Sequence, residues 1–417
     1  MRRYEEYKNS DVAWFGEIPK NWKIARLKDF SVNVKTGTTP SSSKGDFFEN
    51  GTENWYTPSD INNSLIINSS RKLSKYAFDI REVQKFPANC IYLIGIGGTL
   101  GKVGFSNVEA SCNQQINVIQ FNKNYDFKYG FYLMLVIGNT LIKWSNYTTM
   151  PIFTQTNTKN LLLIAPPFSE QQAIANYLDA KTQAIDKKIS LLEQKIETYK
   201  RLKRTLINQT ITKGLDKNVP LKDSDVSYIS KIPSDWKIER IKDLFKIGRG
   251  RVIGQLELVE DGKYPVYSSQ TENNGCLGYI DTYDFDGDLL TWTTDGANAG
   301  TVFRRSGKFN CTNVCGTLKP IRNNLDLNYM VYALQESAIH NKRIDTNGAK
   351  IMNNEMALIK VPLPPKSEQE EIAKYLDHKT ATIDAIVSNI GKQIDTLKQL
   401  RKTLINDVVT GKIKVVE

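Results

Sequence analysis

The sequence predicts an α+β protein in which two globular domains are joined by two long helices that form an antiparallel coiled coil with pseudo-twofold symmetry. Two repeats predict this arrangement. The segment Ile18-Pro19-x-x-Trp22 near the start of the chain returns as Ile232-Pro233-x-x-Trp236. A longer element that begins with Ser169-Glu170-Gln171 returns at Ser367-Glu368-Gln369. Repeats over such a long period indicate two copies of one structural unit.

Composition and charge bound the class of protein. The 417 residues suit two to four domains, and 40% hydrophobic with 24% charged residues are typical of globular proteins. No run approaches the roughly 20 apolar residues of a membrane span, and no signal peptide is recognised. With five cysteines, which fit a reduced compartment, these features predict a cytoplasmic protein without a membrane contact. The net charge of +11 favours a polyanionic partner, most simply nucleic acid.

The first globular block, bounded at residues 1–165, and the second, within residues 215–363, show the same mixture of signals. Both contain short β-like runs, such as Cys90–Ile94 and Asp288–Trp292, separated by turns rich in Gly, Asn and Asp. Each block also has a helical pattern late in its sequence. Both are therefore predicted to be compact α+β domains.

The segments at residues 166–214 and 364–417 show the pattern of a coiled coil. The pairs Pro166-Pro167 and Pro364-Pro365 cannot lie inside a helix and mark where each begins, with Ser169 and Ser367 as the expected N-caps. Residues at heptad spacing then form one seam per helix. The seams comprise Leu178, Thr182, Ile185, Ile189, Leu192, Ile196, Tyr199, Lys203, Leu206 and Thr210, and Leu376, Thr380, Ile383, Val387, Ile390, Ile394, Leu397, Arg401, Leu404 and Val408.

Such a long helix needs a partner. About 40 residues give roughly 60 Å of helix, more than a domain of this size is wide, and the other copy is the obvious partner. Lys203 and Arg401 hold equivalent seam positions, so we expect their stems to pack while their charged ends reach out. Other basic pairs on the coil, such as Lys187-Lys188 and Lys200-Arg201, either face DNA or solvate the helix, and solvation is the default.

Known catalytic constellations are not recognised in the sequence. Gly98–Val103 resembles a phosphate-binding loop, but Ile96 stands where a glycine is required and no Ser or Thr follows Lys102. Two histidines leave little room for histidine-based acid–base or zinc chemistry. An amino-methyltransferase loop would need Asn or Asp where Ala165 precedes the Pro-Pro pair. The sequence therefore favours a protein without catalysis of its own.

The doubled helix opening and the doubled Ile-Pro-x-x-Trp segment resemble the conserved regions of type I restriction–modification specificity subunits. The resemblance covers nearly the whole chain. It implies a target recognition domain at 1–165, a conserved helix at 166–214, a linker with a second recognition domain at 215–363, and a second conserved helix at 364–417. It further implies a non-catalytic subunit that reads a bipartite, asymmetric DNA site, one domain per half-site, with the coil as spacer.

The resemblance also implies partners and cofactors. Double-stranded DNA, two modification (methyltransferase) subunits and restriction subunits are the expected partners. No cofactor is expected on this chain, because S-adenosylmethionine, ATP and Mg are expected in the partner subunits. Frame residues, either structural or partner-binding, are expected in the repeated segments. They are Trp22, Ser169, Glu170, Gln171, Tyr177, Trp236, Ser367, Glu368, Gln369 and Tyr375.

Candidate DNA-binding residues are polar or basic side chains on predicted loops, because base edges are read by donor–acceptor side chains and phosphates by Lys and Arg. In the first domain they are Lys35, Thr36, Thr38, Thr39, Lys44, Thr99, Lys102, Asn113, Gln114 and Gln115. In the second domain they are Arg249, Arg251, Gln270, Asn273, Asn274, Thr294, Asn298, Arg304, Arg305, Arg343 and Lys350. Gly98 and Gly101 are expected near the same relative place as Gly296 and Gly300.

Two other classes of function remain open at this point. The chain could be a DNA methyltransferase with its own cofactor site, which the missing motifs argue against. It could also be a coiled-coil adaptor that links proteins, which the basic charge and the paired variable domains argue against. Binding of S-adenosylmethionine by the purified chain would favour the first alternative, and failure of the assembled complex to bind any duplex above the nonspecific level would favour the second.

Overall fold

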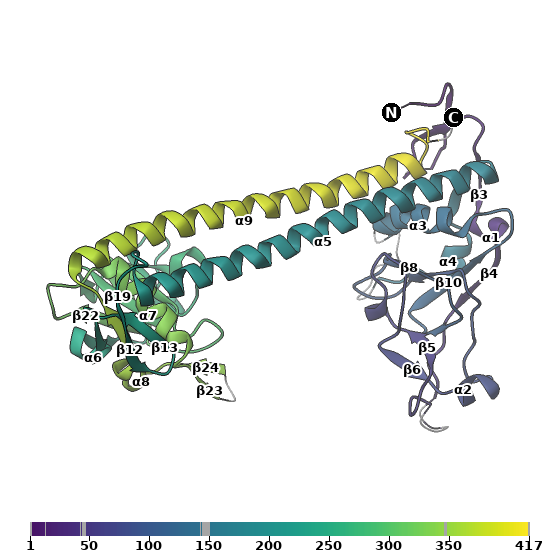
Figure 1. Cartoon of the computed structure of the whole chain (residues 1–417). Helices are drawn as coiled ribbons and strands as arrows, with labels where there is room; N and C mark the ends of the chain where they lie inside the picture. Colours follow the sequence, from purple (N-terminus) through teal and green to yellow (C-terminus); the bar gives the residue numbers. More distant parts are fainter. Residues whose placement is uncertain are drawn as a thin grey trace. The chain divides into compact units, whose positions relative to one another are not determined.

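The chain folds into two compact units. The computed structural model describes residues 2–12, 14–41, 43, 47–141, 143, 151–345 and 348–415. The first unit comprises Met1–Leu192 with Lys392–Glu417, and the second comprises Glu193–Gly391. Each unit therefore contains one globular domain and one part of each long helix (Figure 1).

The domain of the first unit is built on a four-stranded antiparallel sheet with the strand order β4-β10-β7-β8. Its strands are β4 (Ser31–Thr36), β10 (Ile116–Phe121), β7 (Cys90–Ile94) and β8 (Val103–Ser106). A smaller sheet has the order β6-β5-β9, and β3 pairs with β11 where the domain meets α5. The remaining elements are β1 (Tyr7–Asn9), β2 (Glu17–Pro19), β3 (Lys23–Arg26), α1 (Leu27–Phe30), β5 (Glu53–Tyr56), η2 (Pro58–Asp60), β6 (Arg71–Leu73), α2 (Lys75–Asp79), β9 (Ser111–Cys112), α3 (Phe127–Leu141), α4 (Gln155–Lys159) and β11 (Leu162–Ala165).

The domain of the second unit repeats this plan. Its main sheet has the order β15-β22-β19-β20, and β14 pairs with β25 as β3 does with β11. The main strands are β15 (Phe245–Arg249), β22 (Cys315–Pro320), β19 (Leu289–Thr293) and β20 (Val302–Arg305). The other elements are β12 (Leu221–Val226), β13 (Ile229–Pro233), β14 (Lys237–Arg240), α6 (Ile241–Leu244), η4 (Gln255–Glu257), β16 (Tyr264–Tyr267), η5 (Glu272–Gly275), β17 (Cys276–Ile280), β18 (Phe285–Asp286), β21 (Lys308–Cys311), α7 (Leu327–Ile339), β23 (Arg343–Asp345), β24 (Gly348–Lys350), α8 (Asn353–Leu358) and β25 (Lys360–Leu363).

The two long helices, α5 (Phe168–Lys213) and α9 (Lys366–Val409), pack through the predicted seams. Every predicted seam residue is buried or half-buried, whereas the charged positions between them are mostly exposed. In the first unit the Tyr129 hydroxyl lies 3.1 Å from the carbonyl of Val409, at the end of α9, and 3.4 Å from the carbonyl of Ile164, just before α5, so its single proton is shared between them. The start of α5 therefore lies beside the end of α9, which makes the pair antiparallel there, as predicted.

Ion pairs at equivalent places confirm the expectation for the two charged seam residues. In the second unit Lys203 Nζ lies 2.7 Å from Asp384 Oδ2, and in the first Arg401 Nε lies 2.9 Å from Asp186 Oδ1, close enough for an ion pair although not aligned as a hydrogen bond. Both carboxylates belong to the repeated Ile-Asp dipeptide. The two copies of the repeat therefore make the same contact, each within its own unit.

The predicted N-caps are wrong. The helices begin at Phe168 and Lys366, so Ser169 and Ser367 lie inside the first turn. The N–H of Gln171 donates to the carbonyl of Pro167, and that of Gln369 to the carbonyl of Pro365, which makes the prolines the capping residues. A proline suits this boundary because its missing N–H costs no helical hydrogen bond. The prediction that the Pro-Pro pairs mark the helix starts is confirmed.

Candidate nucleic-acid interface

One edge of the main sheet in the first unit gathers three loops. Strands β4 and β7 end there, and β8 and β10 begin there. The N–H groups of Gly37, Thr38 and Gly95 donate to the carbonyls of Ile116, Cys112 and Gln115 at 3.0, 2.9 and 2.8 Å. We call residues 37–39, 95–102 and 113–115 the first loop edge. Loops that are anchored to a rigid sheet suit recognition, because the scaffold fixes their side chains.

The first loop edge carries many of the residues that were predicted from the sequence to bind DNA. Thr99 and Gln114 are exposed, and the Thr39 hydroxyl donates to the Gln114 side-chain oxygen. Asn113 is only 8% exposed and holds the turn by donating to Gln115 Oε1 at 2.9 Å and accepting from the Gln115 N–H at 3.1 Å. Gln115 is half-buried beside it. The turn therefore presents Gln114 on a braced backbone.

The other predicted residues of the first domain lie around this edge. Thr38 is exposed, and its carbonyl accepts from the Trp55 indole at 3.1 Å. Lys35 is exposed on β4, whereas the half-buried Thr36 donates to Asn117 Oδ1 at 2.8 Å. Lys102 is half-buried at the end of the β7–β8 turn. Lys44 lies outside the described residues.

The second unit has an equivalent edge in the same hydrogen-bond register. The N–H groups of Gly250, Arg251 and Thr294 donate to the carbonyls of Cys315, Cys311 and Val314 at 3.0, 3.1 and 3.1 Å. We call residues 250–251, 294–301 and 312–314 the second loop edge. This register makes Gly97 and Gly101, with φ angles of 102° and 88°, the equivalents of Gly296 and Gly300, with 83° and 85°. The prediction for Gly98 was thus displaced by one residue.

Arginines border the second loop edge. Arg249 is exposed and donates through Nε to the carbonyl of Asn313. Arg251 lies 2.8 Å from Glu257 and 3.1 Å from Asp284, so two carboxylates offset its charge and it braces the loop that follows. Asn313 is exposed at the position of Gln114 and was missed from the sequence. Its signal was its place directly before a β-like run, as Gln114 precedes Ile116.

Two further segments of the second unit join its loop edge. Asn298 Nδ2 donates to Thr271 Oγ1 at 3.4 Å, which connects the edge to the loop that holds the half-buried Gln270 and the exposed Asn273 and Asn274. Asp295 pairs with Lys350 in an isolated β-bridge, so the β23–β24 hairpin also lies here. The exposed Arg343 on this hairpin lies 3.1 Å from Glu355. The structure thus brings together residues predicted from four separate loops.

Three predicted residues of the second domain are buried or already paired within the domain. Arg305 is 2% exposed, lies 3.5 Å over the Tyr267 ring and donates to Thr291 Oγ1 and the carbonyl of Asn274. Desolvation lowers the pKa of its guanidinium. Thr294 is fully buried, and Arg304 is held by Asn328 at 3.0 Å and Asp288 at 3.3 Å. In this conformation Arg305 and Thr294 support the edge from within and do not reach a ligand.

The repeated glutamine fixes each domain to the coil. Gln171 Oε1 accepts from the Asp126 N–H at 2.8 Å, and Gln369 Oε1 accepts from the Asp326 N–H at 2.9 Å. Both amides also donate, at 2.9 Å, to the carbonyl of the first proline of the Pro-Pro pair. Because both glutamines are buried, they are structural residues and are not exposed to a partner.

A second repeated contact lies about two helical turns further along each long helix. The Tyr132 hydroxyl donates to Asp179 Oδ1 at 2.8 Å, and that of Tyr332 donates to Asp377 Oδ1 at 2.7 Å, so α3 and α7 lie beside the coil (Figure 1). Burial raises the pKa of Tyr332 to about 12, which keeps this phenol protonated as a donor. Both tyrosines belong to an Asp-x-x-Tyr-x-x-Tyr motif, at residues 126–132 and 326–332, which the sequence prediction missed.

The repeated glutamates differ between the units. Trp236 is fully buried and donates its indole N–H to Glu368 Oε2 at 2.9 Å, and burial raises the pKa of that carboxyl. Trp22 is equally buried, but Glu170 accepts instead from the Tyr4 hydroxyl at 2.5 Å.

The remaining frame residues are accessible. Ser169 and Ser367 are exposed, and Tyr177 and Tyr375 are half-buried, with the ammonium groups of Lys181 and Lys379 lying 5.6 and 5.7 Å from the centres of their rings. These four residues are accessible frame residues.

Replacing Gln369 by Leu should destabilise the protein by about 2–6 kcal/mol. The variant leaves the Asp326 N–H and the Pro364 carbonyl without partners in a buried site, and each loss costs about 1–3 kcal/mol. Urea unfolding measures the change. Ser367→Ala is the matched control on the same helical turn, and as an exposed substitution it should stay within about 0.5 kcal/mol of the parent. Equal stability of both variants would contradict this role for Gln369.

The described residues bear on two other kinds of site. Among them no group of three or more His, Cys, Asp and Glu side chains could hold a metal ion. Within the same ranges no helix is long and apolar enough to cross a membrane. The two features of the described residues that call for a functional explanation are the polar loop edges and the contacts that fix each domain to the coil.

The chain thus has two α+β domains with equivalent loop edges, and each domain is fixed to the two long helices. This arrangement defines a subunit with two recognition domains. The chain belongs to the family of type I restriction modification DNA specificity domains, whose model matches residues 19–198 and 233–396. The prediction of a type I specificity subunit is therefore confirmed, and neither the methyltransferase nor the adaptor alternative is favoured.

Individual relatives agree with this assignment. A sequence named as the N-terminus of a type I specificity subunit in Mycoplasma pneumoniae is 44% identical over 142 residues, which are 34% of this chain and 76% of that protein. The type I restriction enzyme MjaVIII specificity subunit of Methanocaldococcus jannaschii is 22% identical over 433 residues, covering 95% of this chain and 94% of that protein. A chain solved in work on the complex assembly and conformational transition of a type I R-M system has a TM-score of 0.75 at 16% identity, covering 95% of this chain and 99% of that chain. This likeness confirms the predicted fold class.

Proposed function

We propose that this chain reads a bipartite, asymmetric DNA site for a type I restriction–modification complex, with one recognition domain for each half-site. The observation that carries the proposal is the pair of loop edges. Both have the same backbone hydrogen bonds at the same edge of the same sheet, and both expose polar side chains there. Two equivalent edges in one chain suit two contacts with one duplex.

Differences between the edges support an asymmetric site. Gln114 and Thr99 of the first edge correspond to Asn313 and Asn298 of the second, and Gln115 corresponds to Val314. An amide of different length, or an apolar group in place of an amide, presents a different donor–acceptor pattern to the base edges. Each half-site should therefore have its own sequence.

The repeated frame supports two docking places for modification subunits. Ser169, Tyr177 and Lys181 recur as Ser367, Tyr375 and Lys379, accessible once in each unit. Two copies of one surface suit two copies of one partner. We assign residues 1–165 and the recognition part of 215–363 to DNA, and residues 166–214 and 364–417 to the spacer and the docking of partners.

The proposed role has no chemistry of its own. Methylation and cleavage belong to modification and restriction subunits, which carry S-adenosylmethionine, ATP and Mg, while this chain supplies the sequence information in the cytoplasm. The exposed polar side chains of the loop edges, such as Gln114 and Asn313, suit the reading of base edges.

The test is to map the methylated adenines in DNA from the host that carries this chain. The proposal expects one bipartite sequence with two unlike halves separated by a nonspecific spacer of fixed length. Deletion of the gene should abolish methylation of that sequence alone. A continuous recognition sequence, or a symmetric one, would contradict the assignment of one domain to each half.

A further inference from the structure

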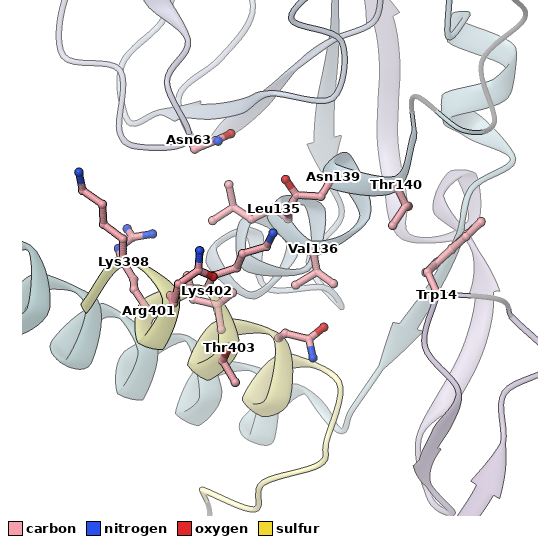
Figure 2. Close-up of a pocket in the computed structure, with 13 residues that line it drawn as sticks. Trp14, Asn63, Leu135, Val136, Asn139, Thr140, Lys398, Arg401, Lys402 and Thr403 are labelled. Atoms are coloured by element: carbon pink, nitrogen blue, oxygen red, sulfur yellow. The ribbon is translucent and has the colours of Figure 1, made fainter. Parts of the chain in front are cut away.

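A groove in the first unit lies between α3 and the C-terminal part of α9. It has a volume of about 630 Å³. Figure 2 shows basic side chains of α9 on one side and the C-terminal part of α3 on the other. Leu135 and Val136 of α3 contribute apolar surface, while Lys398 and Lys402 of α9 are exposed. The described lining residues include no carboxylate.

The groove continues directly from the first loop edge. A Cβ on Gly101, in the β7–β8 turn, would lie 2.1 Å from the Gly138 carbonyl oxygen, so this turn packs on α3 just before Asn139. The Val103 N–H donates to Asn63 Oδ1 at 3.0 Å, and both Asn63 and Asn139 line the groove. A DNA strand that is bound at the first loop edge and passes over this turn therefore reaches the open end of the groove.

The second unit fills the corresponding space. The rings of Tyr228 and His340 stack, with their centroids 5.4 Å apart and an interplanar angle of 5°. Beside them Asn208 Nδ2 donates to Glu336 Oε1 at 3.2 Å. A cavity of about 10 Å³ remains there. In the first unit the equivalent positions hold Trp14, Thr140, Asn406 and Val136. The open groove is thus a feature of the first unit and is not imposed by the repeated fold.

We propose that this groove holds the sugar–phosphate backbone of the DNA beside the first half-site, with Lys398 and Lys402 as the phosphate contacts. The inference rests on the proposed DNA-reading function and assigns part of the coil to DNA. Arg401 also lines the groove, but Asp186 at 2.9 Å offsets its charge. Within the described ranges neither lysine takes part in an ion pair, so both charges are available to a polyanion.

The lining fits a nucleic-acid backbone. Phosphates pair with the two lysines and with the amides of Asn63 and Asn139, while the less polar deoxyribose faces lie against Leu135 and Val136. Such contacts carry no sequence information and act through counterion release. The groove should therefore add affinity and salt dependence without changing which bases are read.

The experiment compares complexes reconstituted with their modification subunits on a duplex that contains the mapped methylation site. For K398Q/K402Q the slope of log affinity against log salt should fall by about 1–2, because each phosphate contact contributes about 0.9. Binding at 50 mM salt should weaken by about tenfold or more. The methylated sequence should stay unchanged. The control K187Q/K188Q removes the same charge from exposed α5 positions outside the groove and should keep the parent slope.

V136E provides a second variant in case the lysine substitutions alter folding. The second unit already accommodates Glu336 at this position, so the variant should fold, and its carboxylate should repel phosphate and weaken binding. Parent slopes for both groove variants would overturn the proposal. A second outcome would also overturn the proposal: the groove variants assemble less well with the modification subunits, but the complexes that do form keep the parent slope. That outcome would favour an acidic protein partner for the groove. If the parent complex itself shows no binding above the nonspecific level, the proposed function fails instead.

Discussion

Exchanging residues 236–361 for the corresponding block of another family member should change one half of the methylated DNA sequence and leave the other half intact. The exchanged block contains the whole second loop edge, whereas the first loop edge belongs to a different compact unit. Each mismatched base pair costs about 1–3 kcal/mol, so a half-site of a few base pairs should lower methylation of the original site by at least about 100-fold.

The structure specifies what the incoming block must retain. Strand β14 pairs with β25 at the base of the domain, so the two cut points lie beside each other. Asp326 and Tyr332 bind Gln369 and Asp377 of the coil, and both lie inside the exchanged block. A donor block with the Asp-x-x-Tyr-x-x-Tyr motif should therefore dock, and one without it should give an unstable chimaera that reveals nothing about specificity.

A matched control replaces the first domain with a block that carries the same motif, and this should alter only the other half of the sequence. Sequencing of methylated DNA from cells with each chimaera reads the outcome. If a stable chimaera changed both halves, or neither, the assignment of one loop edge to each half-site would be wrong. The two exchanges together test the division independently of which bases are read.

The repeated parts of the fold could be predicted from the sequence because a coil seam and its ends impose strict spacing. All twenty seam positions face inward as predicted, and even Lys203 and Arg401 find acidic partners. The N-caps were mispredicted for a physical reason. Ser169 and Ser367 have the right chemistry, but the proline carbonyls two residues earlier already accept the first helical bonds.

The candidate site was only partly predictable, because exposure depends on contacts between loops that are far apart in the sequence. Arg305 and Arg304 are adjacent and chemically identical, yet one is buried against Tyr267 and the other pairs with Asp288. Asn313 was missed because the second domain lacks the Asn-Gln-Gln run of the first. Only the register of β15 with β22 aligns it with Gln114. The filled and open grooves beside α7 and α3 likewise depend on pairs such as Tyr228 with His340.

Replacing Gly101 by Ala should be among the most damaging single substitutions in the first domain, with a loss of about 2–5 kcal/mol. Its φ of 88° is unfavourable for any residue with a Cβ, and the new methyl group would lie 2.1 Å from the Gly138 carbonyl oxygen. A backbone carbonyl inside a helix cannot move out of the way as the end of a flexible side chain can. The β7–β8 turn would have to leave α3, which would displace Thr99 and open the first loop edge.

Two other glycines distinguish the two sources of this cost, the strain of a positive φ and the clash of the new methyl group with the backbone of α3. Gly98, in the same turn, lacks a positive φ and has no atom within 4 Å of a built Cβ, so Gly98→Ala should change stability by less than about 1 kcal/mol. Gly300 has a φ of 85°, but its Cβ would meet only side-chain atoms, the nearest being Ile351 Cδ1 at 3.1 Å. Gly300→Ala should therefore cost about 1–2 kcal/mol from backbone strain. Urea unfolding should rank Gly101 first, Gly300 second and Gly98 last, and a different order would contradict the close packing of the first turn on α3.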